Sequence, residues 1–225
     1  MNEAVAGLSI GVFGGTGPQG RGLIWRFAAA GLPVLLGSRD AARAEAAADE
    51  VTATLPEGAT PVRGAENSAV ARDADLVVVA VPWDGHAALL QSLREPLAGK
   101  IVIDCVNPLG FDKRGAYALE VPEGSAAEQA AELLPESRVV AAFHHVSAVL
   151  LVDPDVASVD LDVLVLGDDR EATDLVAHLA AVIPGVRGIY AGRLRNAHQI
   201  EALTANLISI NRRYKAHAGI RVTDI

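Results

Sequence analysis

The stretch that decides the fold is LSIGVF at positions 8–13, followed at once by GGTGPQG at positions 14–20. The first stretch, with four large apolar residues among its six, predicts a buried strand, and the residues from Gly20 to Ala30 predict a helix. Gly15, Gly17 and Gly20 have the spacing G-x-G-x-x-G between the two elements. In this arrangement the backbone amides at the start of the helix bind the pyrophosphate of a dinucleotide. The stretch therefore predicts a Rossmann unit.

Each glycine of this loop has an expected role. We expect Gly15 to make the tight turn, Gly17 to let the backbone approach the pyrophosphate, and Gly20 to allow the helix to pack closely on the strand. The alternative is a glycine-rich turn that binds nothing. We assign the loop to dinucleotide binding, with Thr16, Pro18 and Gln19 beside the glycines.

The rest of the chain repeats the alternation of strand and helix. Further strands are expected at 33–36, 61–63, 76–81, 101–104, 139–143, 161–166 and 187–190. Further helices are expected at 40–55, 67–72, 85–97, 125–134, 172–183 and 194–215. Such crossovers predict an α/β protein with a doubly wound parallel sheet. We expect a Rossmann domain at 1–146 and a smaller C-terminal α+β domain at 147–225, because the pattern changes after His145.

Composition excludes several classes of protein. Of the 225 residues, 51% are hydrophobic, which allows a substantial core, yet no stretch approaches the ~20 apolar residues of a membrane helix. The formal net charge of −9 disfavours nucleic acid as a partner. The single cysteine, Cys105, and an N-terminus without a signal-peptide profile indicate the cytoplasm. We expect no metal site, because the six histidines and Cys105 show no ligand spacing.

The end of the second strand indicates NADP rather than NAD. An NAD enzyme usually has Asp or Glu there, whereas this chain has Ser38 and Arg39. A guanidinium and a hydroxyl bind a ribose 2′-phosphate, and Arg43 follows one helical turn later. Arg43 could instead belong to a solvated helix face. The carboxylate of Asp40 could repel the phosphate, but we expect it to cap the following helix.

Eleven short stretches extend these signals over nearly the whole chain. They are GGTG at 14–17, GSR at 37–39, VPW at 81–83, KIV at 100–102, NP at 107–108, SAAE at 125–128, AFH at 142–144, GDD at 167–169, AGRLRN at 191–196, EALT at 201–204 and AGI at 218–220. Together they resemble the NADPH-dependent reductases of coenzyme F420, a deazaflavin. The resemblance implies reversible hydride transfer between F420 and NADP, a homodimer, and a small C-terminal domain covering the redox cleft. The chain departs from the family pattern at Gly85, His145 and His198.

In hydride transfer between two carrier rings, the protein has to align the rings but need not supply an acid or a base. We therefore expect no catalytic residue. Ligands of open α/β sheets bind at the carboxyl ends of the strands. The residues expected to line the cofactors there are Val81, Trp83, Asn107, His144, Val146, Ser147, Ala148 and, from the tail, Ala218. Trp83 could instead be a packing residue, His144 and His145 core histidines, and Cys105 a small buried hydrophobe.

Two other functions stay open from the sequence. One is an NADPH-dependent reductase of a small carbonyl or imine, which would need a proton donor such as Tyr117, Asp104 or Asp112. The other is a non-catalytic protein that senses NADP. The basic residues at 212–215 are either a solvated helix end or a site for the anionic tail of the deazaflavin.

Overall fold

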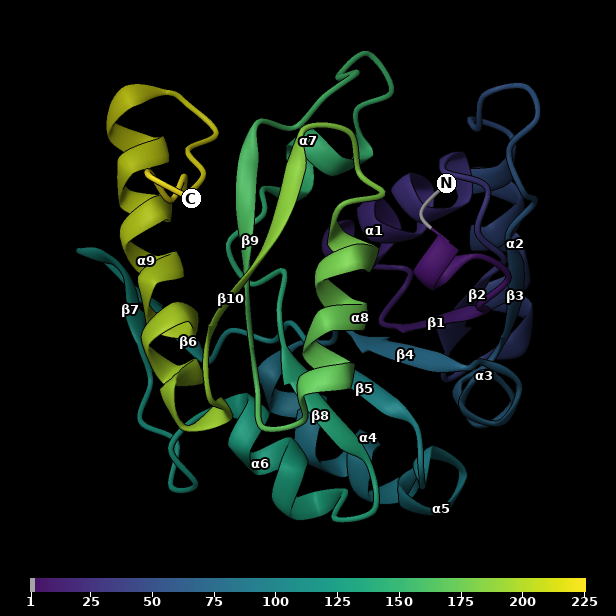
Figure 1. The fold of residues 1–225 in the computed structure, drawn as a ribbon, viewed down its shortest axis with the longest axis horizontal. Helices are drawn as coiled ribbons and strands as arrows, with labels where there is room; N and C mark the ends of the chain where they lie inside the picture. The colour runs from purple at the N-terminus through teal and green to yellow at the C-terminus, as the bar shows by residue number, and fades with distance from the viewer. Residues whose placement is uncertain (1–2) are drawn as a thin grey trace.

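An eight-stranded sheet runs through the computed structural model, which describes residues 3–225 (Figure 1). Its strand order is β10-β9-β8-β5-β4-β1-β2-β3. The strands are β1 (Ile10–Phe13), β2 (Val34–Ser38), β3 (Arg63–Glu66), β4 (Leu76–Val79), β5 (Ile101–Asp104), β8 (Arg138–Ala141), β9 (Leu161–Gly167) and β10 (Val186–Gly192). The order from β3 to β8 is that of the dinucleotide-binding Rossmann fold, so the predicted fold class is confirmed.

Helices cover both faces of the sheet and alternate with the strands. The bounds are α1 (Pro18–Ala29), α2 (Ala41–Thr52), α3 (Asn67–Asp73), α4 (His86–Ser92), α5 (Arg94–Leu97), α6 (Ala126–Leu133), α7 (Ala148–Val152), α8 (Arg170–Ala180) and α9 (Ala197–Tyr214). Three short 3₁₀ turns are at Glu3–Val5, Trp83–Gly85 and Leu194–Asn196. One core lies under α1, α2 and α8, and a second lies under α3 to α6. Both faces of β1 and β4 are therefore buried, as their unbroken apolar sequence predicts.

The same sheet continues past residue 146. Strand β9 pairs antiparallel with β8, and β10 pairs parallel with β9. In Figure 1, α9 stands beside these strands, away from α1 and α2. The division of the chain into domains at 1–146 and 147–225 stays a prediction. The strands on its two sides belong to one sheet.

Predicted helix caps agree with the structure. Asp40 Oδ1 accepts a hydrogen bond from Arg43 N at 2.7 Å, and Ser125 Oγ accepts one from Glu128 N at 3.0 Å. The helix expected over 85–97 is broken after Ser92, because Pro96 has no N–H to donate to the carbonyl of Ser92. No described helix is long and apolar enough to cross a membrane.

A hairpin, β6 (Leu109–Asp112) and β7 (Gly115–Ala118), lies between β5 and α6, where the sequence predicts no strand. Its two strands form a small separate sheet beside α9 (Figure 1). Asp112 Oδ1 accepts from Arg114 N at 2.7 Å in the turn, and Gly115 has a φ of +125°. The glycines and exposed side chains of this segment hide its strand pattern.

The segment after β8 is attached to α1 by a buried arginine. Arg26, in the last turn of α1, donates to the carbonyls of Leu150, Leu151, Asp153 and Val156. One guanidinium group thereby donates to four carbonyls around the C-terminal end of α7, where a helix leaves backbone carbonyls without helical partners. The residues after His145 are thus held against the helix that begins at the glycine loop.

Candidate functional site

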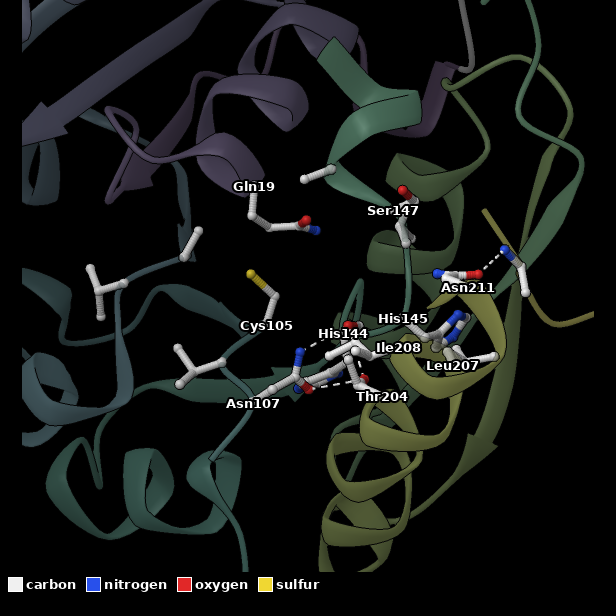
Figure 2. A pocket seen from close by; sticks show the side chains of 16 residues that line it. Gln19, Cys105, Asn107, His144, His145, Ser147, Thr204, Leu207, Ile208 and Asn211 are labelled. Atoms are coloured by element: carbon white, nitrogen blue, oxygen red, sulfur yellow. Dashed lines mark hydrogen bonds between the residues drawn. The ribbon is translucent and has the colours of Figure 1, made fainter. Parts of the chain in front are cut away.

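A cavity of about 370 Å³ opens at the carboxyl ends of β1, β4, β5 and β8. Figure 2 shows it between these strand ends and one face of α9. Its lining residues are Gln19, Ala80, Val81, Cys105, Val106, Asn107, His144, His145, Val146, Ser147, Ala148, Thr204, Leu207, Ile208, Asn211 and Ala218. Eight residues that the sequence assigned to cofactor binding are in this list, namely Gln19, Val81, Asn107, His144, Val146, Ser147, Ala148 and Ala218.

The glycine loop enters the cavity through Gln19, at the start of α1. Gly14 begins the tight turn with a φ of +74°, and its carbonyl accepts from Gly17 N at 2.9 Å, so Gly15 lies in the centre of that turn. A Cβ atom at Gly15 would lie 2.6 Å from Leu36 Cγ, and one at Gly20 would lie 2.5 Å from the Gly14 carbonyl oxygen. These two glycines are required by the packing of the protein itself.

Gly17 differs from its neighbours. Its φ is −84°, which any residue adopts, and a Cβ atom there would meet only the Gly14 carbonyl oxygen, at 3.4 Å. The protein therefore has room for a side chain at the first turn of α1. A pyrophosphate can approach the backbone closely only where no side chain is in the way, and Gly17 leaves that space open.

Ser38, Arg39 and Arg43 lie at the end of β2 and the start of α2, outside the cavity. Both arginines are exposed, and neither side chain pairs with another residue in the described part of the chain. The Asp40 carboxylate is occupied by the Arg43 backbone amide. The two guanidinium groups are thus available to an anion, while the carboxylate between them is occupied by the helix.

Two buried histidines follow β8. His144 and His145 are each 3% exposed, and burial lowers the pKa of both to about 4, so they are neutral at pH 7. Neither ring nitrogen of His144 has a partner among residues 3–225. His145 Nε2 accepts from Leu164 N at 3.3 Å, which leaves a hydrogen on Nδ1. A buried imidazole without a partner on the wall of a cavity is available to hydrogen-bond a ligand.

The backbone before the histidines is in an unusual conformation. Phe143 is buried with a φ of +66°, in the left-handed region that bulky residues rarely adopt. Gln19 Nε2 donates to the Phe143 carbonyl at 3.2 Å, and the Phe143 ring packs edge-on against Phe27 of α1. Helix α1 thus holds the strained turn that brings His144 to the cavity.

Asn107 connects three walls of the cavity. Its Nδ2 donates to the His144 carbonyl at 2.9 Å, and the Thr204 hydroxyl lies 3.2 Å from the same carbonyl and 3.3 Å from Asn107 Oδ1 (Figure 2). On the far side, Asn211 Oδ1 accepts from Ala218 N at 2.6 Å. The C-terminal tail is thereby held against α9 at the cavity wall.

Trp83 lies outside the cavity lining. Its ring is half-buried, and its centroid is 5.4 Å from that of His86. Cys105 is buried at the cavity wall, and burial raises the pKa of its thiol above the ordinary range. It is therefore a thiol rather than a thiolate. No group of three or more His, Cys, Asp or Glu within 3–225 could hold a metal ion.

Sequence reasoning missed the contribution of α9. Thr204, Leu207, Ile208 and Asn211 all line the cavity. Their spacing of i, i+3, i+4 and i+7 marks one helix face. Two polar residues in an otherwise apolar stripe were the signal that could have identified this face.

Because the two buried histidines are neutral, we expect the protein to lose stability in acid. Because folding lowers their pKa values from 6.5 to about 4, stability is full above pH 6.5 and is lost as the pH falls towards 4. Each contributes a loss of up to roughly 3 kcal/mol over that range. Urea unfolding of wild type, His144→Gln and His145→Gln at several pH values measures this. The stability of each variant should fall less steeply than that of wild type, and parallel curves would contradict the prediction.

Comparison with known proteins agrees with this geometry. The family model "NADP oxidoreductase coenzyme F420-dependent" matches residues 9–108. The F420-dependent NADP reductase of Methanothermobacter marburgensis is 40% identical over 223 residues, covering 97% of this chain and 99% of that protein. The reductase of the same name from Methanothermobacter thermautotrophicus is 42% identical over 223 residues, covering 97% and 96%. The chain belongs to the F420-dependent NADP reductase family.

A solved structure extends the agreement to the fold. The 1.70 Å crystal structure of a protein from Arthrobacter sp. FB24, provisionally named an F420-dependent NADP reductase, superposes with a TM-score of 0.81. Its sequence is 31% identical, and the match covers 97% of this chain and 100% of that one. The likeness therefore includes the C-terminal part of the chain, with α9.

Proposed function

We propose that this protein transfers a hydride reversibly between NADPH and coenzyme F420. The observation that carries the proposal is the cavity where the glycine-loop helix, the unpartnered His144 and the inner face of α9 meet. It is supported by whole-length similarity to reductases named for this reaction. The two carriers supply the redox chemistry, and the protein supplies binding, alignment and exclusion of water.

The residues present fit a dinucleotide. The open face of Gly17 and the first turn of α1 would hold the pyrophosphate, with Thr16 and Pro18 beside them. The unpaired side chains of Arg39 and Arg43, with Ser38, would hold the 2′-phosphate.

The residues present also fit a second, flat ring. We infer that Val146, Ser147 and Ala148 form the wall against which the deazaflavin lies, opposite Val81 and the end of β4. The neutral His144 offers one hydrogen-bond donor and one acceptor there. Apolar side chains with few polar groups are typical of a pocket that orients a ring system.

The three residues that the sequence offered as proton donors for a carbonyl or imine lie outside the cavity lining. Of the three candidates, Tyr117 and Asp112 lie on the hairpin, and Asp104 is fully buried against His86. None of them lines the cavity. This observation favours hydride exchange between carriers over the reduction of a small carbonyl or imine substrate.

One assay separates the proposed function from its alternatives. Purified protein is mixed with NADPH and F420, and the visible absorbance of the oxidised deazaflavin is followed. Bleaching with stoichiometric oxidation of NADPH is the expected result. Tight NADPH binding without bleaching would indicate a sensor, and turnover only with carbonyl or imine substrates would indicate the other reductase class.

Hydride transfer without a protein acid predicts a small effect of histidine replacement. His144→Gln should lower the rate only about tenfold, through lost alignment, whereas removal of a general acid costs roughly 100- to 10,000-fold. His145→Gln should behave alike. Stopped-flow kinetics with NADPH deuterated at the transferred position measures both the rate and the fate of the label. A thousandfold loss, or exchange of the label with solvent, would refute the mechanism.

We propose a homodimer in the cytoplasm. Exposed Phe111 and Tyr117 on the hairpin and Ile210 and Tyr214 on α9 support an apolar contact surface, since α9 packs against β7. The single cysteine supports a reducing compartment. Sedimentation equilibrium should give twice the chain mass of 23.3 kDa, and a mass of 23.3 kDa at micromolar concentration would exclude the dimer.

A further inference from the structure

A fully buried histidine lies beneath the cavity wall without contacting the cavity. His86, the first residue of α4, is 0% exposed. Its Nε2 is 2.6 Å from Asp104 Oδ2, and its Nδ1 is 2.9 Å from Gln129 Oε1. The Gln129 amide is oriented by its other end, because Nε2 donates to Glu123 Oε1 at 3.2 Å. Both ring nitrogens of His86 therefore face oxygen acceptors.

An imidazole between two acceptors must donate from both nitrogens, and only the imidazolium does so. The charged groups around the ring agree with this state. The groups whose charge acts on the ring are Asp104 from β5 and Glu201 from α9, and burial raises the pKa of Glu201 to about 7. Glu123, from the segment before α6, is joined to the ring through Gln129. Burial lowers the pKa of His86, but the charge and hydrogen bond of Asp104, together with the Gln129 hydrogen bond and the Glu201 carboxyl, more than offset this, so the net shift is upward.

The ion pair is joined to the segments that follow β4 and β5, both of which line the cavity. Asp104 is the last residue of β5, and its second oxygen, Oδ1, accepts from Val106 N at 3.0 Å. This bond sets the turn that leads into Asn107, whose amide donates to the His144 carbonyl. Trp83, which follows β4, packs against the His86 ring.

We propose that His86, as an imidazolium paired with Asp104, is a positioning residue that holds Asn107, and Val81 through the nearby Trp83, in place for hydride transfer. The proposal rests on the proposed function. The pair does not line the cavity, so we expect it to affect alignment rather than phosphate binding, which we assign to Gly17 and Arg39. A buried ion pair adds little stability compared with apolar residues of the same volume, so a role in placing its neighbours accounts better for its presence.

The variants to compare are His86→Gln, Asp104→Asn and the double variant. Loss of either partner alone leaves a buried charge unpaired, whereas the double variant leaves none. We expect each single variant to lower kcat about tenfold while the Kd for NADPH changes less than about threefold. The double variant should recover part of the rate. The exposed His178 of α8 supplies the matched control, and His178→Gln should leave both values unchanged.

A measurement independent of turnover tests the charge itself. In a Trp25→Phe background Trp83 is the only tryptophan, and an adjacent imidazolium quenches its emission. Because the pKa of His86 is raised above 6.5, the positioning is complete below that value and is lost as the pH rises through the folded pKa. Emission should therefore increase over that range in His86 protein and stay flat in His86→Gln.

Two results would overturn the proposal. One is a neutral ring, seen as ¹⁵N imidazole shifts of a single tautomer at pH 7. The other is a folded His86→Gln protein that loses thermal stability but keeps its kcat, as expected of a purely structural role. Failure of the proposed function is recognised separately, because wild type would then not bleach F420 while the fluorescence titration of Trp83 would still report His86.

Discussion

Gly17→Val is expected to abolish NADPH binding in a protein that still folds. A valine fits the backbone angles at this position, and its Cβ atom makes only an ordinary contact with the Gly14 carbonyl. The side chain would instead occupy the space that a pyrophosphate needs against the first turn of α1. We expect Kd to rise by about 100-fold or more, which is at least about 2.7 kcal/mol.

The neighbouring glycine gives the matched control. Gly20→Val would press a side chain into the backbone of Gly14 and Gly15, so it should lower the melting temperature. Gly17→Val should melt within a few degrees of wild type. Circular dichroism and isothermal titration with NADPH distinguish the two outcomes. Normal NADPH affinity in folded Gly17→Val protein would mean that the phosphates bind elsewhere.

Arg39→Ala is expected to weaken binding of NADPH far more than that of NADH. The guanidinium is exposed and unpaired among the described residues, so its removal disturbs no internal contact. Loss of charge-assisted bonds to the 2′-phosphate should cost on the order of 1.5–3 kcal/mol, about a 10- to 150-fold rise in Kd. The affinity for NADH, which has no 2′-phosphate, should stay within about threefold of wild type.

Arg63 provides a control for general electrostatics. It is an exposed arginine on the adjacent strand β3, and Arg63→Ala removes the same charge. NADPH affinity should fall much less in this variant than in Arg39→Ala. Titrations at two salt concentrations separate a direct contact from long-range attraction. Equal losses for both nucleotides in Arg39→Ala would contradict the assignment of the 2′-phosphate to this position.

Local sequence signals predicted the strands and caps of the Rossmann part well. The apolar runs of β1, β4 and β5, and the caps at Asp40 and Ser125, depend on neighbours in the chain. The hairpin of β6 and β7 could not be predicted in this way, because half of its residues are exposed and its glycines resemble a loop.

Within the site, the sequence predicted only the residues that follow the general rule for ligand positions in open α/β sheets. Ligands lie at the carboxyl ends of parallel strands, so Asn107, His144 and Val81 could be identified in advance. The cavity-lining face of α9 could not be predicted, because no local sequence pattern indicates which strand ends a distant helix will cover. Likewise, the left-handed conformation of Gly14, with its φ of +74°, could not be predicted from the spacing of the glycines.

The position of α1 has a consequence for engineering. This helix carries Gln19 at its first turn and Arg26 at its last, and Arg26 fastens α7, whose first residue, Ala148, lines the cavity. The arginines that we assign to the 2′-phosphate belong to β2 and α2, outside this unit. Substitutions in β2 and α2 should thus be able to change the nucleotide preference, for example towards NADH, without redesign of the wall that binds the ring. Changes along α1 would alter both halves of the site together.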